Sequence, residues 1–149
     1  MNVIVLAGEN KDYNSTNKAF YKIHDKYMIE YVIETLKNTK YIDKIAVIGP
    51  KEKLETVIGS MVDYIEEGTD SIVSNIFLGL EFFPNKKEML LVTSDIPMIT
   101  VEAIEDFIDR SRLQNVDLCY SIVEKKVNDE KYPGVKRTYA RLWDGQFTG

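Results

Sequence analysis

Short apolar runs alternate along this chain with longer segments in which apolar residues recur at helical spacing. The apolar runs predict strands at residues 3–7, 45–48, 61–66 and 89–93. The helical spacing predicts helices over residues 28–37 and 52–58, after a cap at Asp70 or Ser71, and after a cap at Thr100. This alternation predicts an α/β fold in which a mostly parallel sheet lies between two helical layers.

Two of these segments carry a specific expectation about burial. The run at residues 89–93 shows no polar alternation, so we expect a strand buried on both faces. In the segment that Pro84 ends, Ile72, Ile76 and Leu80 lie on one helical face, with Val73 and Phe77 beside them. We expect that face to point into the core.

The last third of the chain departs from the alternation. It predicts a strand at residues 118–123, a charged loop at 124–137, and a hairpin of residues 139–143 and 146–148 around Asp144-Gly145. Such a tail forms either an antiparallel edge of the main sheet or part of a separate subdomain. The length of 149 residues suits one domain over residues 1–149.

Composition narrows the class of protein. The chain is 44% hydrophobic and 29% charged, which is typical of a soluble globular protein. A net charge of -5 argues against binding to nucleic acid, which requires clustered Lys and Arg. A single cysteine, Cys119, excludes an internal disulfide and favours the cytoplasm. No apolar segment is long enough to span a membrane, so we do not expect a membrane as partner. From the net charge we do not expect a nucleic acid as partner either.

Asp95 is the first candidate for chemistry, because it directly follows the apolar run at residues 89–93 and precedes Pro97. Open parallel sheets bind their ligands beyond the carboxyl ends of the strands. A carboxylate there suits Mg²⁺, which prefers oxygen ligands. A plain turn residue before a proline is an equal alternative.

Gly8 and Lys18 are the next candidates. Gly8 ends the first predicted strand, where a backbone without a side chain allows a ligand to come close. Lys18 precedes apolar Ala19 and Phe20, which would anchor the segment and aim the ammonium inward as a charge for a triphosphate. A solvated surface lysine is the alternative. Neither the P-loop pattern nor the three-glycine dinucleotide pattern is present.

Taken in order, these motifs resemble the MobA-like NTP transferase family, which includes molybdenum cofactor guanylyltransferase and sugar-1-phosphate nucleotidylyltransferases. The resemblance covers nearly the whole chain. Its segments are Leu6-Ala7-Gly8, Asn17-Lys18-Ala19-Phe20, residues 26–36, residues 45–49 and residues 93–100.

The resemblance implies a GT-A-like nucleotide-diphospho-sugar transferase fold. It also implies Mg²⁺-dependent transfer of a nucleoside monophosphate from an NTP to a phosphorylated small molecule, with release of pyrophosphate. The residues that match the family are a nucleotide loop at Leu6, Ala7 and Gly8, a phosphate contact at Lys18, base and ribose contacts at Ser71 and Asn75, and a magnesium ligand at Asp95. For Ser71 a helix cap, and for Asn75 a solvent-facing position, stay open as alternatives.

The chain departs from the family pattern at two places. Glu9 stands where the family has glycine, and its carboxylate would oppose a triphosphate, with Lys11 as the nearby cation. Related chains also continue beyond a segment like the one ending at Gly149, so we expect a truncated chain whose exposed apolar surface favours self-association. A catalytically weak nucleotide-binding domain is therefore the second hypothesis. A GT-A glycosyltransferase is the third, because no Asp at position 93 completes an Asp-x-Asp pair.

Overall fold

The computed structural model describes residues 1–8, 17–85, 87–114 and 116–149. These residues fall into two compact units, Met1–Asp106 and Phe107–Gly149, with helix α4 spanning the boundary. The prediction of one domain over residues 1–149 stays a prediction. Among the described residues, no helix has the length and apolarity needed to cross a membrane.

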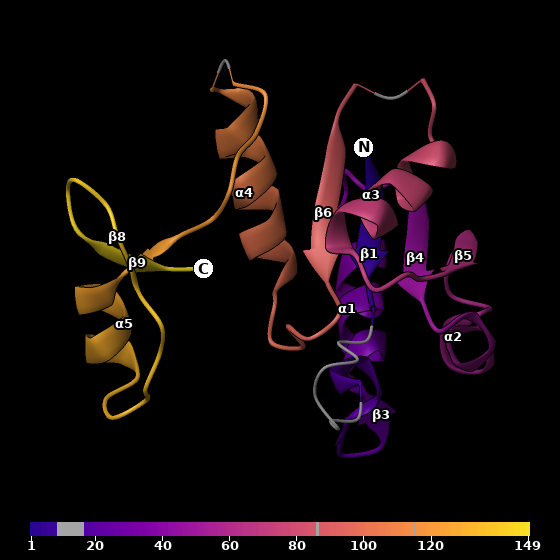
Figure 1. Cartoon of the computed structure of the whole chain (residues 1–149), viewed down its shortest axis with the longest axis horizontal. Coiled ribbons are helices and arrows are strands. Elements are labelled where there is room, and N and C mark those ends of the chain that lie inside the picture. The colour runs from indigo at the N-terminus through magenta and orange to yellow at the C-terminus, as the bar shows by residue number, and fades with distance from the viewer. Residues whose placement is uncertain (9–16, 86, 115) are drawn as a thin grey trace. The chain divides into compact units, whose positions relative to one another are not determined.

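The first unit is built on a four-stranded parallel sheet with the order β5-β4-β1-β6 (Figure 1). The four predicted strands are confirmed, although the one expected from residue 61 begins later, because the Met61 N–H still donates to the Ile58 carbonyl at the end of α2. The strands are β1 (Asn2–Leu6), β4 (Ile45–Gly49), β5 (Tyr64–Glu67) and β6 (Met89–Thr93).

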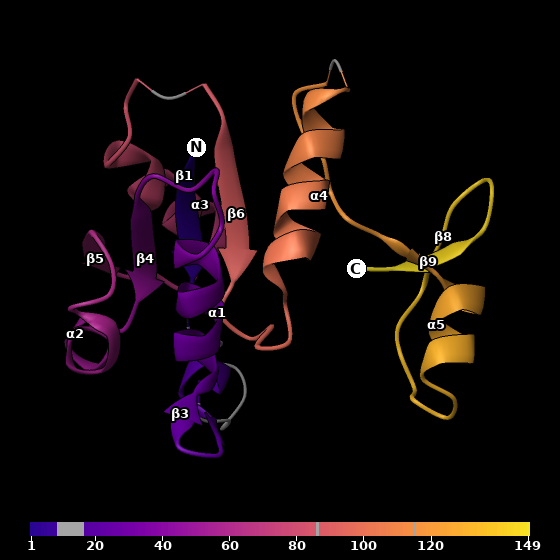
Figure 2. The same cartoon turned by 180° about the vertical axis from the view of Figure 1, so that it is seen from behind.

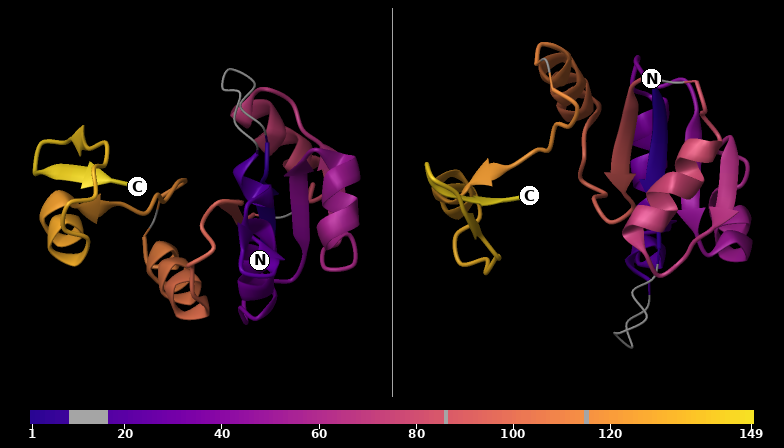
Figure 3. Two further views of the ribbon diagram at one scale, coloured as in Figure 1. Left: turned by 90° about the horizontal axis from the view of Figure 1, so that it is seen from below. Right: turned by 45° about the horizontal axis from the view of Figure 1, so that its top comes forward.

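Helices lie on both faces of this sheet. Figures 1 and 2 show α3 on one face and α1 on the other, and the tilted view in Figure 3 shows α3 lying across β1 and β4. The expected three-layer α/β architecture is therefore confirmed. The helices are α1 (Met28–Lys37), α2 (Lys51–Ile58), α3 (Ile72–Glu81) and α4 (Val101–Arg112), and α4 begins at the predicted cap, since the Ala103 N–H donates to Thr100 Oγ1 over 3.2 Å.

The core follows the alternation of side chains along the strands. Ile4 and Ile48 belong to a buried cluster with Phe83, against which Leu78 and Leu80 of α3 pack. The intervening strand residues point to the opposite face, and they are also buried. On that face and in the helices that cover it, the fully buried side chains include Val3, Val5, Val47, Ile29, Ile33, Leu36, Leu54 and Ile58.

Helix α3 turns a different face to the sheet from the one that its apolar residues predict. Its buried residues are Asn75 and Gly79, whereas Ile72, Val73 and Phe77 are 69%, 61% and 63% exposed. A Cβ atom at position 79 would lie only 2.6 Å from Ile4 Cγ2. The predicted inward face is therefore wrong for Ile72, Val73 and Phe77, whereas Leu80 packs against the core as expected. Gly79 allows α3 to approach β1 too closely for a large side chain at that position.

Strand β6 is buried on one face rather than on both. Leu90 and Val92 are 8% and 9% exposed, but Leu91 between them is 40% exposed. Within the part of the chain that the structure describes, β6 pairs only with β1 and forms an edge of the sheet, while α3 contacts β1 and β4. The prediction of a strand covered on both faces is therefore wrong for this edge.

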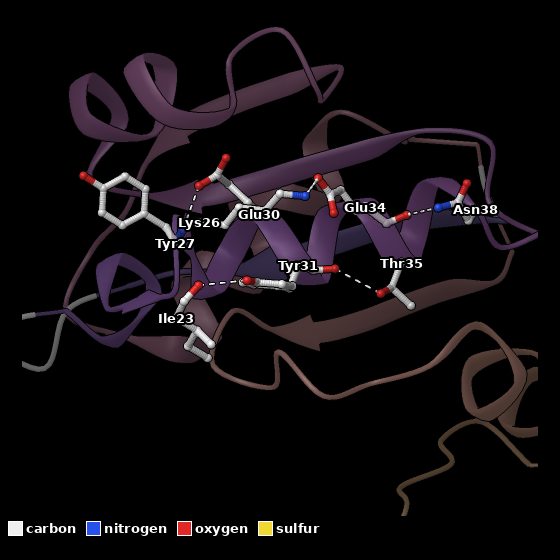
Figure 4. A network of polar contacts seen from close by, with 8 residues as sticks. All are labelled: Ile23, Lys26, Tyr27, Glu30, Tyr31, Glu34, Thr35 and Asn38. Atoms are coloured by element: carbon white, nitrogen blue, oxygen red, sulfur yellow. Dashed lines mark hydrogen bonds and ion pairs between the residues drawn. The ribbon is translucent and has the colours of Figure 1, made fainter.

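A short hairpin before α1 is attached to that helix by polar contacts (Figure 4). It consists of β2 (Lys22–Ile23) and β3 (Lys26–Tyr27), and the exposed His24 lies in its turn at a φ of 56°. The Tyr31 hydroxyl donates to the Ile23 carbonyl over 2.8 Å. Lys26 and Glu34 form an ion pair at 2.6 Å, and the hydrogen bond that the Lys26 ammonium donates to the Glu34 carboxylate raises the pKa of Lys26.

The second unit holds an antiparallel sheet of order β7-β9-β8. Its elements are β7 (Val123–Glu124), α5 (Lys125–Lys131), β8 (Ala140–Arg141) and β9 (Gln146–Thr148). The predicted terminal hairpin is confirmed, because Ala140 pairs with Phe147 and Leu142 donates to the Gly145 carbonyl. This sheet is separate from the parallel one, so the tail does not form an edge of the main sheet.

Two predictions for this region are wrong. Only Val123 of the strand expected at residues 118–123 is in a strand, and the loop expected at 124–137 contains helix α5. Side-chain contacts support this helix: Lys125 pairs with Asp129, and the buried Asn128 donates to the Tyr139 hydroxyl over 2.8 Å. The high charge that suggested a loop thus belongs to a solvated helix with an i,i+4 ion pair.

We predict that Gly79→Ala destabilises the first unit. Alanine favours a helix over glycine, but the added methyl group overlaps Ile4, which is fully buried, and such overpacking costs about 1–3 kcal/mol. Urea unfolding followed by circular dichroism measures the change. Ser74→Ala, on the exposed side of the same helix, is the control, and a Gly79→Ala protein as stable as that control would contradict the close packing of α3.

Candidate functional site

Three neighbouring strands, β1, β4 and β5, have glycines at their carboxyl ends: Gly8, Gly49 and Gly68. A Cβ atom at position 49 would lie 2.6 Å from the Ala7 carbonyl oxygen, and one at position 68 would lie 3.0 Å from Gly49 Cα. The Gly68 N–H donates to the Gly49 carbonyl over 2.9 Å. The strand ends are thus packed backbone to backbone, and we call these residues the glycine edge.

Asn75 of α3 lies beside the glycine edge and is 4% exposed. Its Oδ1 accepts hydrogen bonds from the Thr69 N–H at 2.6 Å and from Thr69 Oγ1 at 3.0 Å, and its Nδ2 donates to the Thr69 carbonyl at 3.0 Å. A Cβ atom at position 8 would lie 3.1 Å from Asn75 Nδ2. The alternative of a solvent-facing Asn75 is therefore wrong: this side chain holds the loop after β5 against Gly8.

Ser71 is exposed and caps α3, since its hydroxyl accepts a hydrogen bond from the Ser74 N–H at 3.2 Å. Asn75 lies four positions further along the chain, but Ser71 caps α3 whereas Asn75 holds Thr69. A contact of Ser71 or Asn75 with a base or ribose stays a prediction.

Lys18 begins a short 3-10 helix, η1 (Lys18–Phe20), whose position is set by its neighbours in sequence. Ala19 is fully buried and Phe20 is 6% exposed, so these residues anchor the segment as predicted. The Asn17 side chain donates to the Ala7 carbonyl over 2.8 Å and accepts from the Ala19 N–H at 2.9 Å. These contacts fix η1 against the end of β1.

Lys18 and Asp95 meet at this edge although they are 77 positions apart in the sequence. Lys18 Nζ lies 3.3 Å from Asp95 Oδ2. The turn that carries Asp95 is attached to β1, because the Ser94 N–H donates to the Leu6 carbonyl over 3.1 Å. The structure thus brings the predicted cation, the predicted carboxylate and the end of β1 together.

Both partners of this ion pair are accessible, with 68% of the Lys18 side chain and 35% of the Asp95 side chain exposed. Exposed pairs contribute about 0–1 kcal/mol to stability, so either group is free to exchange its partner for a ligand at little cost. The pair therefore has little value as a structural link. Its accessibility at the carboxyl ends of parallel strands suits ligand binding.

Other lysines near this edge are already engaged. Lys51, which begins α2, lies 3.5 Å from Glu66, and its N–H donates to Glu67. The pKa of Glu66 is lowered by the Glu67 N–H and by Lys51. Lys53 Nζ lies 4.1 Å from the centre of the Phe20 ring, in a cation–π contact.

The donor set for a metal at this edge is small. Among the described residues, no group of three His, Cys, Asp or Glu side chains is placed to hold a metal ion. A single accessible carboxylate, Asp95, fits Mg²⁺, which is commonly bound by one or two carboxylates together with waters and substrate phosphates. It does not fit a metal that needs a complete protein cage.

Several residues that build this site were missed or unassigned in the sequence. The close packing of Gly49 and Gly68 had no local signal, since it joins the ends of different strands. Thr69 was not singled out, although its partner Asn75 lies only six positions further along the chain, in α3. Asn17 precedes a helical segment, and the preference of Asn for helix caps was a signal that could have identified it. Glu9 and Lys11, on which the doubt about phosphate affinity rests, lie outside the described residues.

Comparisons of the sequence and of the structure with known proteins give consistent matches. A sequence model of the MobA-like NTP transferase domain matches residues 3–133. The probable molybdenum cofactor guanylyltransferase of Thermococcus sibiricus is 24% identical over 120 residues, which cover 78% of this chain and 58% of that protein. The bifunctional protein GlmU of Caldanaerobacter subterraneus subsp. tengcongensis is 29% identical over 115 residues, which cover 73% of this chain and 24% of that protein.

A solved structure of a hypothetical transferase from Thermus thermophilus superposes with a TM-score of 0.79 at 28% identity. The match covers 99% of this chain and 62% of that chain. It confirms the expected GT-A-like α/β fold. This chain spans less than two thirds of the length of each of these three proteins.

We predict that Asn75→Ala destabilises the first unit by about 1–2 kcal/mol, because the Thr69 N–H and carbonyl lose buried partners. Urea unfolding measures the loss. Asn38→Ala is the matched control, since the Asn38 side chain makes an exposed hydrogen bond to the Glu34 carbonyl. Equal effects of the two substitutions would show that Asn75 does not hold the loop.

Proposed function

The chain belongs to the MobA-like NTP transferase family, and from that premise we propose that it is a nucleotidyltransferase that moves a nucleoside monophosphate from an NTP to a phosphorylated small molecule. The observation that carries the proposal is the Lys18–Asp95 pair, accessible and next to the backbone-lined end of β1. The products would be the nucleotidylated acceptor and pyrophosphate.

The nucleoside would bind along the glycine edge. Gly8 is exposed there, and the absence of a side chain leaves room for close approach of a ligand to its backbone. Leu6 and Ala7 would support this loop, because their carbonyls are already held by Ser94 and Asn17. Base and ribose would contact the loop that Asn75 holds and the exposed Ser71. Because both Asn75 amide atoms already bond to Thr69, its main contribution would be to shape that loop.

The triphosphate would lie toward Lys18 and Asp95. The Lys18 ammonium would leave Asp95 and pair with phosphate oxygens, which an exposed and weak ion pair allows. Asp95 would then be the carboxylate that holds Mg²⁺. When bound, Mg²⁺ supplies charge neutralisation for the phosphates and helps to orient them.

The reaction itself needs little covalent help from the protein. An oxygen of the acceptor phosphate attacks the α-phosphorus, a new P–O bond forms, and the bond from the α-phosphorus to the bridging oxygen breaks as pyrophosphate leaves with that electron pair. Such transfers depend chiefly on positioning and on stabilisation of developing charge. Lys18 would offset the charge that accumulates on the leaving pyrophosphate.

The partners in this proposal are an NTP and a phosphorylated acceptor, whereas a nucleic acid or a membrane is not required. The acidic net charge of -5 is consistent with a small-molecule substrate whose phosphates are neutralised locally. The cytoplasmic location and the self-association of the chain stay predictions.

We predict that Asp95→Ala removes the Mg²⁺-dependent part of NTP affinity and leaves the fold unchanged. Loss of one charged contact corresponds to a roughly 10- to 100-fold weaker binding. Calorimetric titration of each NTP with and without Mg²⁺ measures the effect, and thermal unfolding reports the fold. Asp25→Ala, in the exposed turn of the β2–β3 hairpin, serves as control, and unchanged titrations for Asp95→Ala would refute its assigned role.

Lys18→Gln should weaken triphosphate binding about tenfold, because a neutral amide cannot pair with phosphate charge. The same substitution should barely change the binding of the corresponding nucleoside, which carries no phosphate. Comparing the two ligands by calorimetry tests this, with Lys37→Gln in the last turn of α1 as control. If nucleoside and triphosphate binding fell equally, Lys18 would not be the phosphate contact.

A further inference from the structure

Asn17 occupies an unusual position at the site, because one side chain connects two parts of the proposed binding surface. It is 9% exposed. Its Nδ2 donates to the carbonyl of Ala7, at the end of β1, and its Oδ1 accepts from the N–H of Ala19, within η1. It therefore joins the backbone beside Gly8 to the segment that carries Lys18.

We infer that Asn17 is a positioning residue for the proposed nucleotidyl transfer. Its amide sets the position of Lys18 relative to the backbone of Ala7 and Gly8. The distance between the residue that would contact the phosphates and the loop that would contact the nucleoside is thereby fixed. This inference rests on the proposed function.

The backbone around Asn17 transmits its position to Lys18. The Phe20 N–H donates to the Asn17 carbonyl over 3.1 Å, and the Tyr21 N–H donates to the Lys18 carbonyl over 3.0 Å. These bonds make η1 a closed turn, so a displacement of Asn17 moves Lys18 with it. The Lys18 side chain itself is 68% exposed and is not held in place by burial.

The other end of the connection is equally well fixed. The Ala7 N–H donates to the Ile48 carbonyl over 2.8 Å, which ties Ala7 to β4, and the Ala7 carbonyl accepts from Asn17. Gly49 packs against the same carbonyl, since a Cβ atom there would lie 2.6 Å from it. Asn17 thus fixes the position of the segment that carries Lys18 relative to Ala7 and the glycine edge.

The chemistry of the two hydrogen bonds distinguishes this role from simple capping of a helix. Capping uses only the Oδ1 acceptor, and Asp and Ser cap as well as Asn does. The bond to Ala7 requires a donor, which an ionised Asp lacks. A role confined to capping would therefore survive Asn17→Asp, whereas the positioning role would not.

The test uses the full chain with Asn17→Asp, and Asn38→Asp as a control with the same change of charge. Asn38 ends α1, at the end of the helix that leads into the start of β4, and its side chain is exposed. Binding of NTP with Mg²⁺ and of the matching nucleoside is measured at pH 8 by calorimetry. Backbone amide NMR of Gly8 and Ala19 reports the two ends of the Asn17 side chain without any ligand.

We expect Asn17→Asp to weaken triphosphate binding about tenfold, as for loss of one buried hydrogen bond. The Gly8 amide signal should shift and the Ala19 signal should keep the shift of a capped N–H. Asn38→Asp should match the wild type in ligand binding and in the Gly8 and Ala19 signals. Asn17→Ser, another good cap that lacks the amide, should weaken binding similarly. Thermal unfolding of all variants excludes global unfolding as the cause.

The outcomes separate the two proposals. Wild-type binding of an NTP together with unchanged binding by Asn17→Asp, or an unchanged Gly8 signal, would overturn the positioning role and leave the proposed function standing. A wild-type chain that binds no NTP in the presence of Mg²⁺ would overturn the proposed function. In that case the amide signals alone decide whether Asn17 couples Ala7 to η1, and an unshifted Gly8 would refute even that coupling.

Discussion

The close approach of backbones at the glycine edge is the constraint on which the rest of this structure depends. Ala7, Gly49 and Gly68 lie so near one another that side chains at the glycine positions would meet backbone atoms. Strands β5, β4 and β1 thereby end with their backbones packed against one another. Gly8 is exposed next to this packed edge, and its lack of a side chain allows a ligand to approach the backbone closely.

Helix α3 places Asn75 and Gly79 against the sheet and buries only part of its apolar surface, through Leu78 and Leu80. Gly79 lets it lie close to Ile4, and Asn75 then reaches the loop at Thr69. As a consequence, the side chains of Ile72, Val73 and Phe77 remain exposed. Hydrogen bonds to both amide atoms of Asn75 offset the free-energy cost of removing them from water. A polar residue is therefore tolerated at this core position.

The proposed chemistry depends on two weakly coupled parts of the molecule being held in register. The turn after β6 carries Asp95, and η1 carries Lys18, yet both are tied to β1 through Leu6 and Ala7. Strand β1 lies inside the sheet and pairs on both sides, which makes it a rigid support. Weak, exposed charges on rigid supports are suited to binding a highly charged ligand, since they change partner without disturbing the fold.

The sequence by itself determined the elements whose signals are local. Helix α1 and strand β6 have the predicted bounds, because helical periodicity and an uninterrupted apolar run are properties of neighbouring residues. Lys18 and Asp95 stood out for the same reason, as charged groups next to apolar segments. Tertiary structure alone decided that Asn75 is buried, that Leu91 is exposed and that Asn17 reaches Ala7, because each depends on a partner distant in sequence.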